Sequence, residues 1–285
     1  MKKINKFLLI SVISPLFLLT GISIYSTDTA IFREIQNSKK MKEVLAIFRA
    51  YGDLIDNIER QGEDIVFIIR GRPIYYKNGK MLSEEHLSHY PDYNSFFYYY
   101  RKGSLKGPPD PAPFPYNRSN DFLNALLGDT EKEIRDSSTW IGFLGHQVFV
   151  HRLCIEPLKK IDMKINEYAE ASKEVQEFIS SISVIYSMKR RKVAGTDNLS
   201  YHSYGLALDL IPKSYTNKQV YWKWSSVFNP DWGNIPLSRR WLPPAEIIDA
   251  FEENGFVWGG KWYHFDNVHF EYRPEILYLT GDAFD

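Results

Sequence analysis

Two short segments of the chain contain histidine and aspartate in spacings that could bind a metal ion. The first covers residues 200–209 and holds His202 and Asp209, and the second covers residues 262–271 and holds His269. Imidazole and carboxylate groups are both ordinary zinc ligands, and a catalytic zinc keeps three protein ligands with one position open for water. A pair close in sequence with a distant third residue meets that need. His202, Asp209 and His269 are therefore the candidate ligands.

The first segment predicts a strand with an aspartate on a face of small residues. Over residues 205–211, strand alternation puts Gly205, Ala207 and Asp209 on one face and leucines on the other, where they can face a core. The small residues leave room beside Asp209 for a metal ion and a substrate backbone. We expect a turn before the strand to bring the ring of His202 back over this face.

The second segment adds a carboxylate three residues before its histidine. On an ideal strand Asp266 and His269 would point to opposite faces, so we expect a turn between them. A carboxylate beside a metal site can accept a proton from water and pass it to a leaving amine. Spacing alone leaves a second interpretation open, because a histidine near a strand end is more often a structural hydrogen-bonding residue than a ligand.

The rest of the chain predicts helices and strands without a regular βαβ alternation. Helices are expected over residues 27–60, 158–168 and 243–254, and strands over residues 65–76, 205–211 and 267–272. This mixture favours an α+β fold over a doubly wound sheet.

Charge and cysteine content exclude two kinds of protein. The chain has 285 residues with 35 basic and 35 acidic side chains, so no overall basic field is available to hold nucleic acid. Its one cysteine, Cys154, excludes a disulfide within the chain. Cys154 stands among apolar residues, which favours a buried, inert thiol over a nucleophile.

The amino terminus is typical of an export signal. Lys2, Lys3 and Lys6 precede an uncharged and mostly apolar run over residues 7–25. This pattern predicts either a cleaved signal peptide or an uncleaved membrane anchor, with the protein in the periplasm or cell envelope. A buried N-terminal helix is the alternative.

Three regions follow from these signals. Residues 1–26 form the signal or anchor, and residues 27–116 form a region of unknown role that ends in a proline-rich connector over residues 103–115. Residues 117–285 contain both candidate segments and are expected to form the catalytic domain.

Taken together, the two segments resemble a known family. The pattern Ser-x-His-x-x-Gly-x-Ala-x-Asp, followed by Asp-x-x-His, is similar to the zinc peptidases that include D-alanyl-D-alanine carboxypeptidases and L-alanyl-D-glutamate endopeptidases. The resemblance extends over residues 145–275, including 191–196 and 255–260. It implies a small, mostly antiparallel sheet flanked by helices, as in Hedgehog proteins and DD-peptidases, here with an N-terminal extension.

The resemblance also implies roles for the two segments. His202, Asp209 and His269 match the ligands of one zinc ion, and Asp266 matches the acid/base position. Many members have glutamate there, whereas the phage-endolysin-like branch has aspartate. The implied substrate is a peptidoglycan stem peptide that contains D-residues.

Further positions follow from the same resemblance. Arg191 matches an arginine that binds the substrate or polarises its carbonyl, although the adjacent Arg190 could take this role, and Ser200 is expected to line the site or orient a ligand. His264 imitates the family's other form, Glu-x-x-His. The residue three before it is Lys261, which cannot replace a carboxylate base, so His264 is not expected to be a ligand.

The implied activity is zinc-dependent hydrolysis of a peptide bond, most simply as a D-alanyl-D-alanine-type carboxypeptidase. An L-alanyl-D-glutamate-type endopeptidase is the first alternative, because both activities use the same metal centre. A peptidoglycan-binding protein without turnover is the second. A structural zinc domain is disfavoured, since structural sites normally close with four protein ligands and only three positions match.

Overall fold

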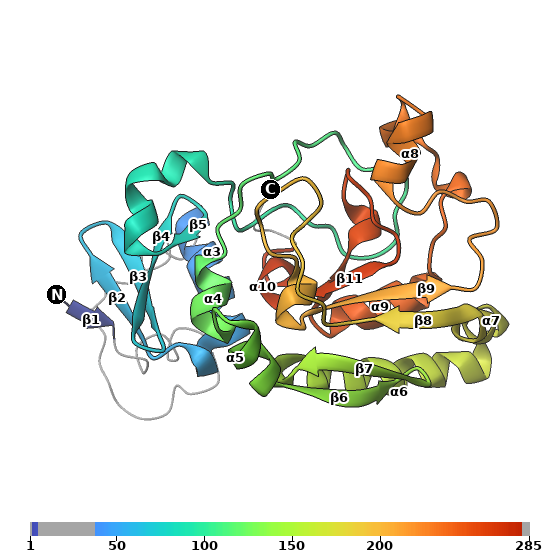
Figure 1. The fold of residues 1–285 in the computed structure, drawn as a ribbon, viewed down its shortest axis with the longest axis horizontal. Coiled ribbons are helices and arrows are strands. Elements are labelled where there is room, and N and C mark those ends of the chain that lie inside the picture. Colours follow the sequence, from blue (N-terminus) through green and yellow to red (C-terminus); the bar gives the residue numbers. More distant parts are fainter. Residues whose placement is uncertain (1, 5–37, 281–285) are drawn as a thin grey trace, which may run out of the picture. The chain divides into compact units, whose positions relative to one another are not determined.

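A computed structural model of the chain describes residues 2–4 and 38–280. The segment 7–25, expected to be a signal or anchor, lies outside the described residues. Within them, no helix combines the length and the apolar character needed to cross a membrane. The chain divides into two compact units, and each is described by itself (Figure 1).

The described residues of the first unit are 2–4, 38–98 and 117–126. Its centre is an antiparallel sheet whose strands follow one another in chain order, from β1 to β5. The elements of this unit are β1 (Lys2–Ile4), α3 (Lys39–Tyr51), η1 (Gly52–Leu54), β2 (Asn57–Gln61), β3 (Asp64–Ile69), β4 (Arg72–Lys77), β5 (Lys80–Leu82), η2 (Glu84–Asp92) and α4 (Asp121–Leu127).

Of the helix expected from residue 27 to about residue 60, residues 27–37 lie outside the described residues, and the C-terminal end is wrong. The described helix α3 ends at Tyr51, and β2 follows from Asn57. Ile58 pairs with Phe67 across the β2–β3 ladder, so sheet pairing outweighs local helical spacing here. The strands expected over residues 65–76 are confirmed as β3 and β4.

The second unit comprises residues 99–116 and 127–280, so the proline-rich segment groups with it. The boundary expected at residue 117 stays a prediction. The elements of this unit are α5 (Glu131–Asp136), β6 (Ser138–Phe143), β7 (His146–His151), η3 (Arg152–Cys154), α6 (Ile155–Ala171), α7 (Lys173–Ser181), β8 (Ile182–Tyr186), η4 (Tyr201–Tyr204), β9 (Ala207–Pro212), α8 (Trp222–Phe228), η5 (Trp232–Asn234), η6 (Leu237–Arg239), α9 (Ala245–Glu253), β10 (Phe256–Trp258), η7 (Gly259–Lys261), β11 (His269–Tyr272) and α10 (Pro274–Leu277).

A four-stranded antiparallel sheet is the scaffold of the second unit. Its strand order is β10-β11-β9-β8, which places the two segments singled out in the sequence next to each other, on β9 and β11 (Figure 1). A separate hairpin, β6–β7, lies along α6, and α9 packs against both α6 and β10. The fold is thus α+β with antiparallel sheets flanked by helices, as the sequence predicted.

The leucines in β9 and just before it form part of the core. Leu206, Leu208 and Leu210 are at most 1% exposed, which confirms that this face is turned inward. The strand itself begins at Ala207, two residues later than expected, because Gly205 is in a left-handed turn. Cys154 is also buried, and burial raises the pKa of its thiol, as expected for an inert cysteine.

Candidate metal centre

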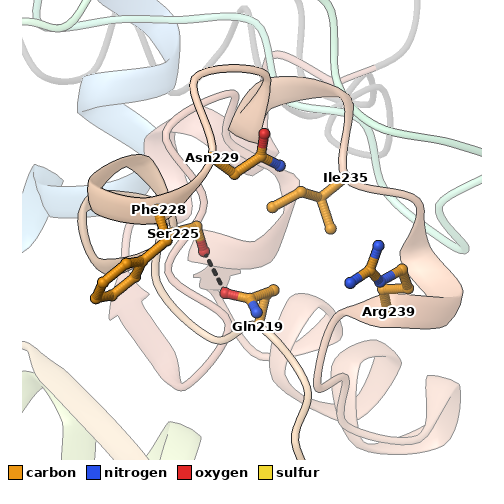
Figure 2. A pocket seen from close by; sticks show the side chains of 6 residues that line it. All are labelled: Gln219, Ser225, Phe228, Asn229, Ile235 and Arg239. Carbon is orange, nitrogen blue, oxygen red and sulfur yellow. Dashed lines mark hydrogen bonds between the residues drawn. The ribbon is translucent and has the colours of Figure 1, made fainter.

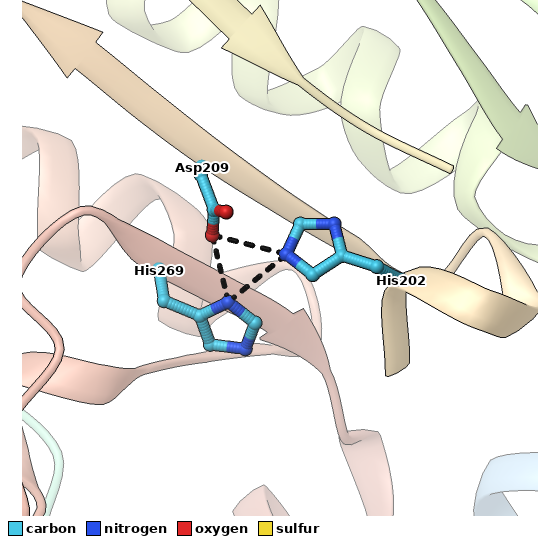
Figure 3. A group of neighbouring side chains, drawn as sticks. All are labelled: His202, Asp209 and His269. Atoms are coloured by element: carbon cyan, nitrogen blue, oxygen red, sulfur yellow. Dashed lines mark hydrogen bonds and ion pairs between the residues drawn. The ribbon is translucent and has the colours of Figure 1, made fainter. Parts of the chain in front are cut away.

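Three side chains converge above the β9–β11 ladder. His202 Nε2 lies 3.0 Å from Asp209 Oδ1 and 3.3 Å from His269 Nδ1, and His269 Nδ1 lies 2.8 Å from Asp209 Oδ1. Figure 3 shows the two rings and the carboxylate pointing toward one another from three different segments. The structure therefore brings together the three residues that the sequence predicted as ligands.

The sheet places Asp209 and His269 side by side. The two residues are direct partners in the antiparallel ladder between β9 and β11. A hydrogen bond from the amide of Leu210 to the carbonyl of Val268 lies one residue beyond the pair. In an antiparallel ladder, two opposite residues whose hydrogen bonds lie one residue to either side form a non-hydrogen-bonded pair. The Cα atoms of such a pair are roughly 4.5 Å apart. Both side chains therefore share one face at short range.

A tight turn before β9 supplies the third side chain. His202 lies in η4, which ends at Gly205 with φ of +67°. A Cβ atom at Gly205 would lie 2.7 Å from the backbone nitrogen of His151, so both the conformation and the space require glycine. Ser200 caps the turn, and its hydroxyl accepts a hydrogen bond from the amide of His202 at 3.4 Å. The expected turn is confirmed.

Each histidine ring is fixed by an acceptor on its outer side. His202 Nδ1 lies 2.7 Å from the carbonyl oxygen of Ser187, and His269 Nε2 lies 3.1 Å from Glu271 Oε2. Carbonyl oxygens and ionised carboxylates accept hydrogen bonds and cannot donate them. His202 Nδ1 and His269 Nε2 therefore carry the hydrogens of these two contacts. His202 Nε2 and His269 Nδ1 therefore face the space beside Asp209, and they are the ring atoms that can bind a metal ion when they carry no proton.

This donor set fits a zinc ion. Tetrahedral ligands about 2.0 Å from zinc are roughly 3.3 Å from one another, close to the separations of the three atoms. Two of the donors are buried, with His202 1% and His269 7% exposed. The cluster can hold a metal ion with three protein ligands and leave a fourth position open.

The electrostatics of the cluster favour a positive charge. Burial acts to raise the pKa of Asp209, but hydrogen bonds with His202 and His269 hold it well below its usual range. Burial acts to lower the pKa of His269, but hydrogen bonds with Asp209 and Glu271 raise it to about 10. The space between these groups is thus a favourable place for a proton or a cation.

Asp266 lies at the turn that leads into β11. The amide of His269 donates to the Asp266 carbonyl at 3.2 Å, which confirms the expected turn between the two residues. Burial raises the pKa of the Asp266 carboxyl to about 7, with the nearby His269 acting to lower it and Asp209 to raise it. A partly buried carboxyl beside the cluster suits proton transfer near neutral pH.

Tyr221 is the cross-strand neighbour of Asp266. An isolated antiparallel bridge joins the two residues, and its hydrogen bonds lie one residue to either side of the pair. The two side chains therefore project from the same face at close range. Burial, then the charge of Asp266, raises the pKa of the Tyr221 hydroxyl.

The structure distinguishes the two adjacent arginines. The guanidinium of Arg191 lies 3.7 Å from Asp209 Oδ2, and its side chain is 43% exposed. The hydroxyl of Ser203 fixes the backbone here, accepting from the Arg191 amide at 2.9 Å and donating to its carbonyl at 2.8 Å. Arg190 is exposed. Arg191 is therefore the arginine at the cluster.

His264 belongs to an aromatic cluster rather than to the metal centre. Its ring packs against the rings of Phe114, Trp222 and Trp232 at centroid distances of 4.7 to 5.2 Å. Burial lowers its pKa. The region between the two candidate segments, residues 212–242, is rich in tryptophan. Part of this tryptophan-rich region is thus packed, while Trp224 is 60% exposed.

A pocket of about 400 Å³ lies in the same tryptophan-rich region (Figure 2). The pocket is lined by Gln219, Ser225, Phe228, Asn229, Ile235 and Arg239. Its only internal hydrogen bond drawn in Figure 2 joins the Ser225 hydroxyl to the Gln219 side-chain oxygen at 2.8 Å. It shares no lining residue with the candidate metal centre.

Comparison with known proteins agrees with this geometry. Residues 194–272 match a family model described as D-alanyl-D-alanine carboxypeptidase. This segment is similar to that family of peptidases. The match spans all three members of the cluster and Asp266, so the resemblance inferred from the sequence is confirmed over the peptidase segment. No curated protein and no solved structure matches the chain.

Sequence reasoning missed several residues around the peptidase site. Glu271 could have been found, because it follows His269 by two residues and shares its face of the strand. Tyr221 and the carbonyl of Ser187 could not, since each reaches the site only through the tertiary fold.

Proposed function

We propose that the second unit hydrolyses a peptide bond in peptidoglycan stem peptides with one zinc ion bound by His202, Asp209 and His269. The proposal depends mainly on one observation, the convergence of two imidazole nitrogens and a carboxylate oxygen at 2.8 to 3.3 Å. The family match over residues 194–272 supports the reaction class.

The chain's own residues divide the chemistry between them. Bound zinc supplies Lewis-acid polarisation of the scissile carbonyl and of water. The Asp266 carboxylate accepts a proton from the attacking water and delivers it to the leaving amine. The guanidinium of Arg191, exposed enough to reach a substrate, stabilises negative charge that develops on the carbonyl oxygen. Ser200 holds the turn that carries His202, and substrate contact by Ser200 stays a prediction.

The bond cut is proposed to be that of a D-alanyl-D-alanine-type carboxypeptidase. The name of the matching family favours this choice. An L-alanyl-D-glutamate-type endopeptidase would use the same residues on a different stretch of peptide. A wall-binding protein without turnover is the alternative outside enzymology.

We also propose that the protein works outside the cytoplasm. The lysines before residue 7 and the apolar run over residues 7–25 support export, with or without a retained anchor. Peptidoglycan is found in the same compartment.

The test is mass spectrometry of muropeptides with intact stem peptides after incubation with the zinc-loaded full chain. Loss of a single D-alanine would establish a carboxypeptidase, and larger peptide fragments an endopeptidase. If the folded, zinc-loaded protein yields no product but sediments with peptidoglycan, the wall-binding alternative replaces the proposal.

A further inference from the structure

A buried network of charged side chains lies behind the candidate ligand His269. Glu271 is 6%, Arg273 2% and Glu275 0% exposed. Glu271 Oε2 lies 3.1 Å from His269 Nε2, and Glu271 Oε1 accepts from Arg273 at 3.4 Å. The same guanidinium donates through Nε to Glu275. This network thus extends from the ring of His269 into the core of the second unit.

Strand geometry explains why these groups meet. His269 and Glu271 are two residues apart in β11, so their side chains project from the same face. Each oxygen of Glu271 has its own partner, one the ring and the other the guanidinium. The carboxylate is therefore held on both sides, and it in turn fixes the plane of the imidazole ring.

The guanidinium of Arg273 also reaches the segment that carries the other histidine. Its central carbon lies 4.9 Å from the centroid of the Tyr201 ring, and Tyr201 directly precedes His202 in η4. One buried side chain therefore contacts both ligand-bearing segments, through Glu271 on β11 and through Tyr201 on η4.

The buried side chains behind His269 include two carboxylates and one guanidinium. When ionised, Glu271 and Glu275 carry two negative charges against one positive charge on Arg273. Burying charge costs free energy, and well-packed apolar residues are often as stable as a buried ion pair. Asp209, on the other side of the ring, adds a further carboxylate. The burial of these charged groups therefore does not by itself explain their presence through stability of the fold.

We propose that Glu271 is a positioning residue of the metal centre and that Arg273 and Glu275 hold it in place. Glu271 keeps the hydrogen of His269 on Nε2, turns the Nδ1 lone pair toward the metal and strengthens it as a donor. The inference rests on the proposed function only in taking His269 as a ligand.

The test measures zinc affinity of the full chain by competition with a chromophoric chelator. Replacing Glu271 by glutamine keeps the size and an acceptor oxygen but removes the charge. We expect Glu271→Gln to weaken zinc binding by roughly 10- to 100-fold. In the zinc-loaded wild type, ¹⁵N spectra of the histidine rings should show the hydrogen of His269 on Nε2, and in the variant this signal should shift.

Two further variants separate positioning from general stability. Glu252 is another buried carboxylate of the second unit, 3% exposed, which pairs with Lys261 and accepts from Tyr100 at 2.6 Å. Glu252→Gln should leave zinc affinity unchanged even if it lowers the unfolding temperature. Glu275 contacts Arg273 and not the ligand ring, so Glu275→Gln should weaken zinc binding less than Glu271→Gln. If Glu271→Gln fails to fold, Glu275→Gln still tests the network behind His269.

The outcomes distinguish the two proposals. Wild-type zinc affinity in Glu271→Gln, or equal losses in Glu271→Gln and Glu252→Gln, would overturn the positioning role and leave the proposed function standing. A wild-type chain that binds no zinc would overturn both.

Discussion

Asp266 is the side chain on which the proposed proton transfer depends most directly. We predict that Asp266→Asn lowers kcat on muropeptides by about 10²- to 10⁴-fold, because an amide cannot accept the proton from water. Zinc content should stay at the wild-type level, since Asp266 is not one of the converging ligands. Kinetics and metal analysis of the same samples check both parts. Asp136→Asn, at an exposed carboxylate on α5, is the matched control.

Arg191 and Arg190 offer a paired test at adjacent positions. Both side chains are exposed, and the Arg191 guanidinium lies 3.7 Å from Asp209. Arg191→Gln should lower kcat/KM by roughly 10²-fold through loss of oxyanion stabilisation. Arg190→Gln should stay close to wild type in the same assay. The reverse order of effects would assign the role to Arg190.

Among the elements, the turn η4 is the one whose backbone fixes a ligand. Gly205→Ala should reduce the free energy of unfolding by several kcal/mol, because the new Cβ would add a contact of 2.7 Å with the backbone of His151 to the strain of a positive φ. Zinc affinity should fall as well, since His202 precedes this glycine in the turn. Urea unfolding and chelator competition measure the two effects.

Gly145 provides the control for this substitution. It has φ of +77° in the β6–β7 turn, with nothing within 4 Å of an added Cβ. Gly145→Ala should therefore cost only the backbone strain, about 1 kcal/mol. Equal losses in the two variants would show that the clash at Gly205 is relieved by small shifts.

The end of β7 carries a pH-dependent contribution to stability. Burial, then the charge of Arg152, lowers the pKa of His151 from 6.5 to about 4. His151 Nδ1 accepts a hydrogen bond from the Leu153 amide at 3.2 Å, which requires this nitrogen to be unprotonated. The unfolded chain binds a proton below about pH 6.5 and the folded chain only near pH 4, so stability is lost as the pH falls through this window.

We predict that His151→Asn, which keeps a capping acceptor, flattens this part of the pH profile. The difference in free energy of unfolding between wild type and His151→Asn should change by about 3 kcal/mol between pH 6.5 and 4, at roughly 1.4 kcal/mol per pKa unit. Unfolding by urea across this range measures it. Parallel profiles would mean that His151 is not the responsible group.

Much of the peptidase segment could be predicted from the sequence because its signals are local. The leucines of β9, the turn before it, and the turn between Asp266 and His269 all follow from short patterns. Residues 57–60 could not be assigned to a strand, since they pair with β3 in the tertiary fold. The place of Tyr221 opposite Asp266 likewise depends on a long loop returning to the site.

At the scale of the whole molecule, the candidate chemistry is confined to one of the two units. All three converging ligands, Asp266 and Arg191 lie within residues 127–280. The chain as a whole is neutral, with 35 basic and 35 acidic residues. Electrostatic effects at the candidate site therefore come from the local arrangement of charged groups and not from the net charge of the protein. No residue of the first unit is assigned a part in the proposed reaction.

Removing the metal from the full chain and returning it tests the proposed zinc centre. Muropeptide hydrolysis should disappear when a chelator has removed the metal, and one equivalent of zinc should restore it. In Asp209→Asn, zinc returned at the same concentration should fail to restore the wild-type rate, because one converging ligand has lost its charge. Hydrolysis that persists after verified metal removal, or full activity in Asp209→Asn, would contradict a zinc centre built from His202, Asp209 and His269.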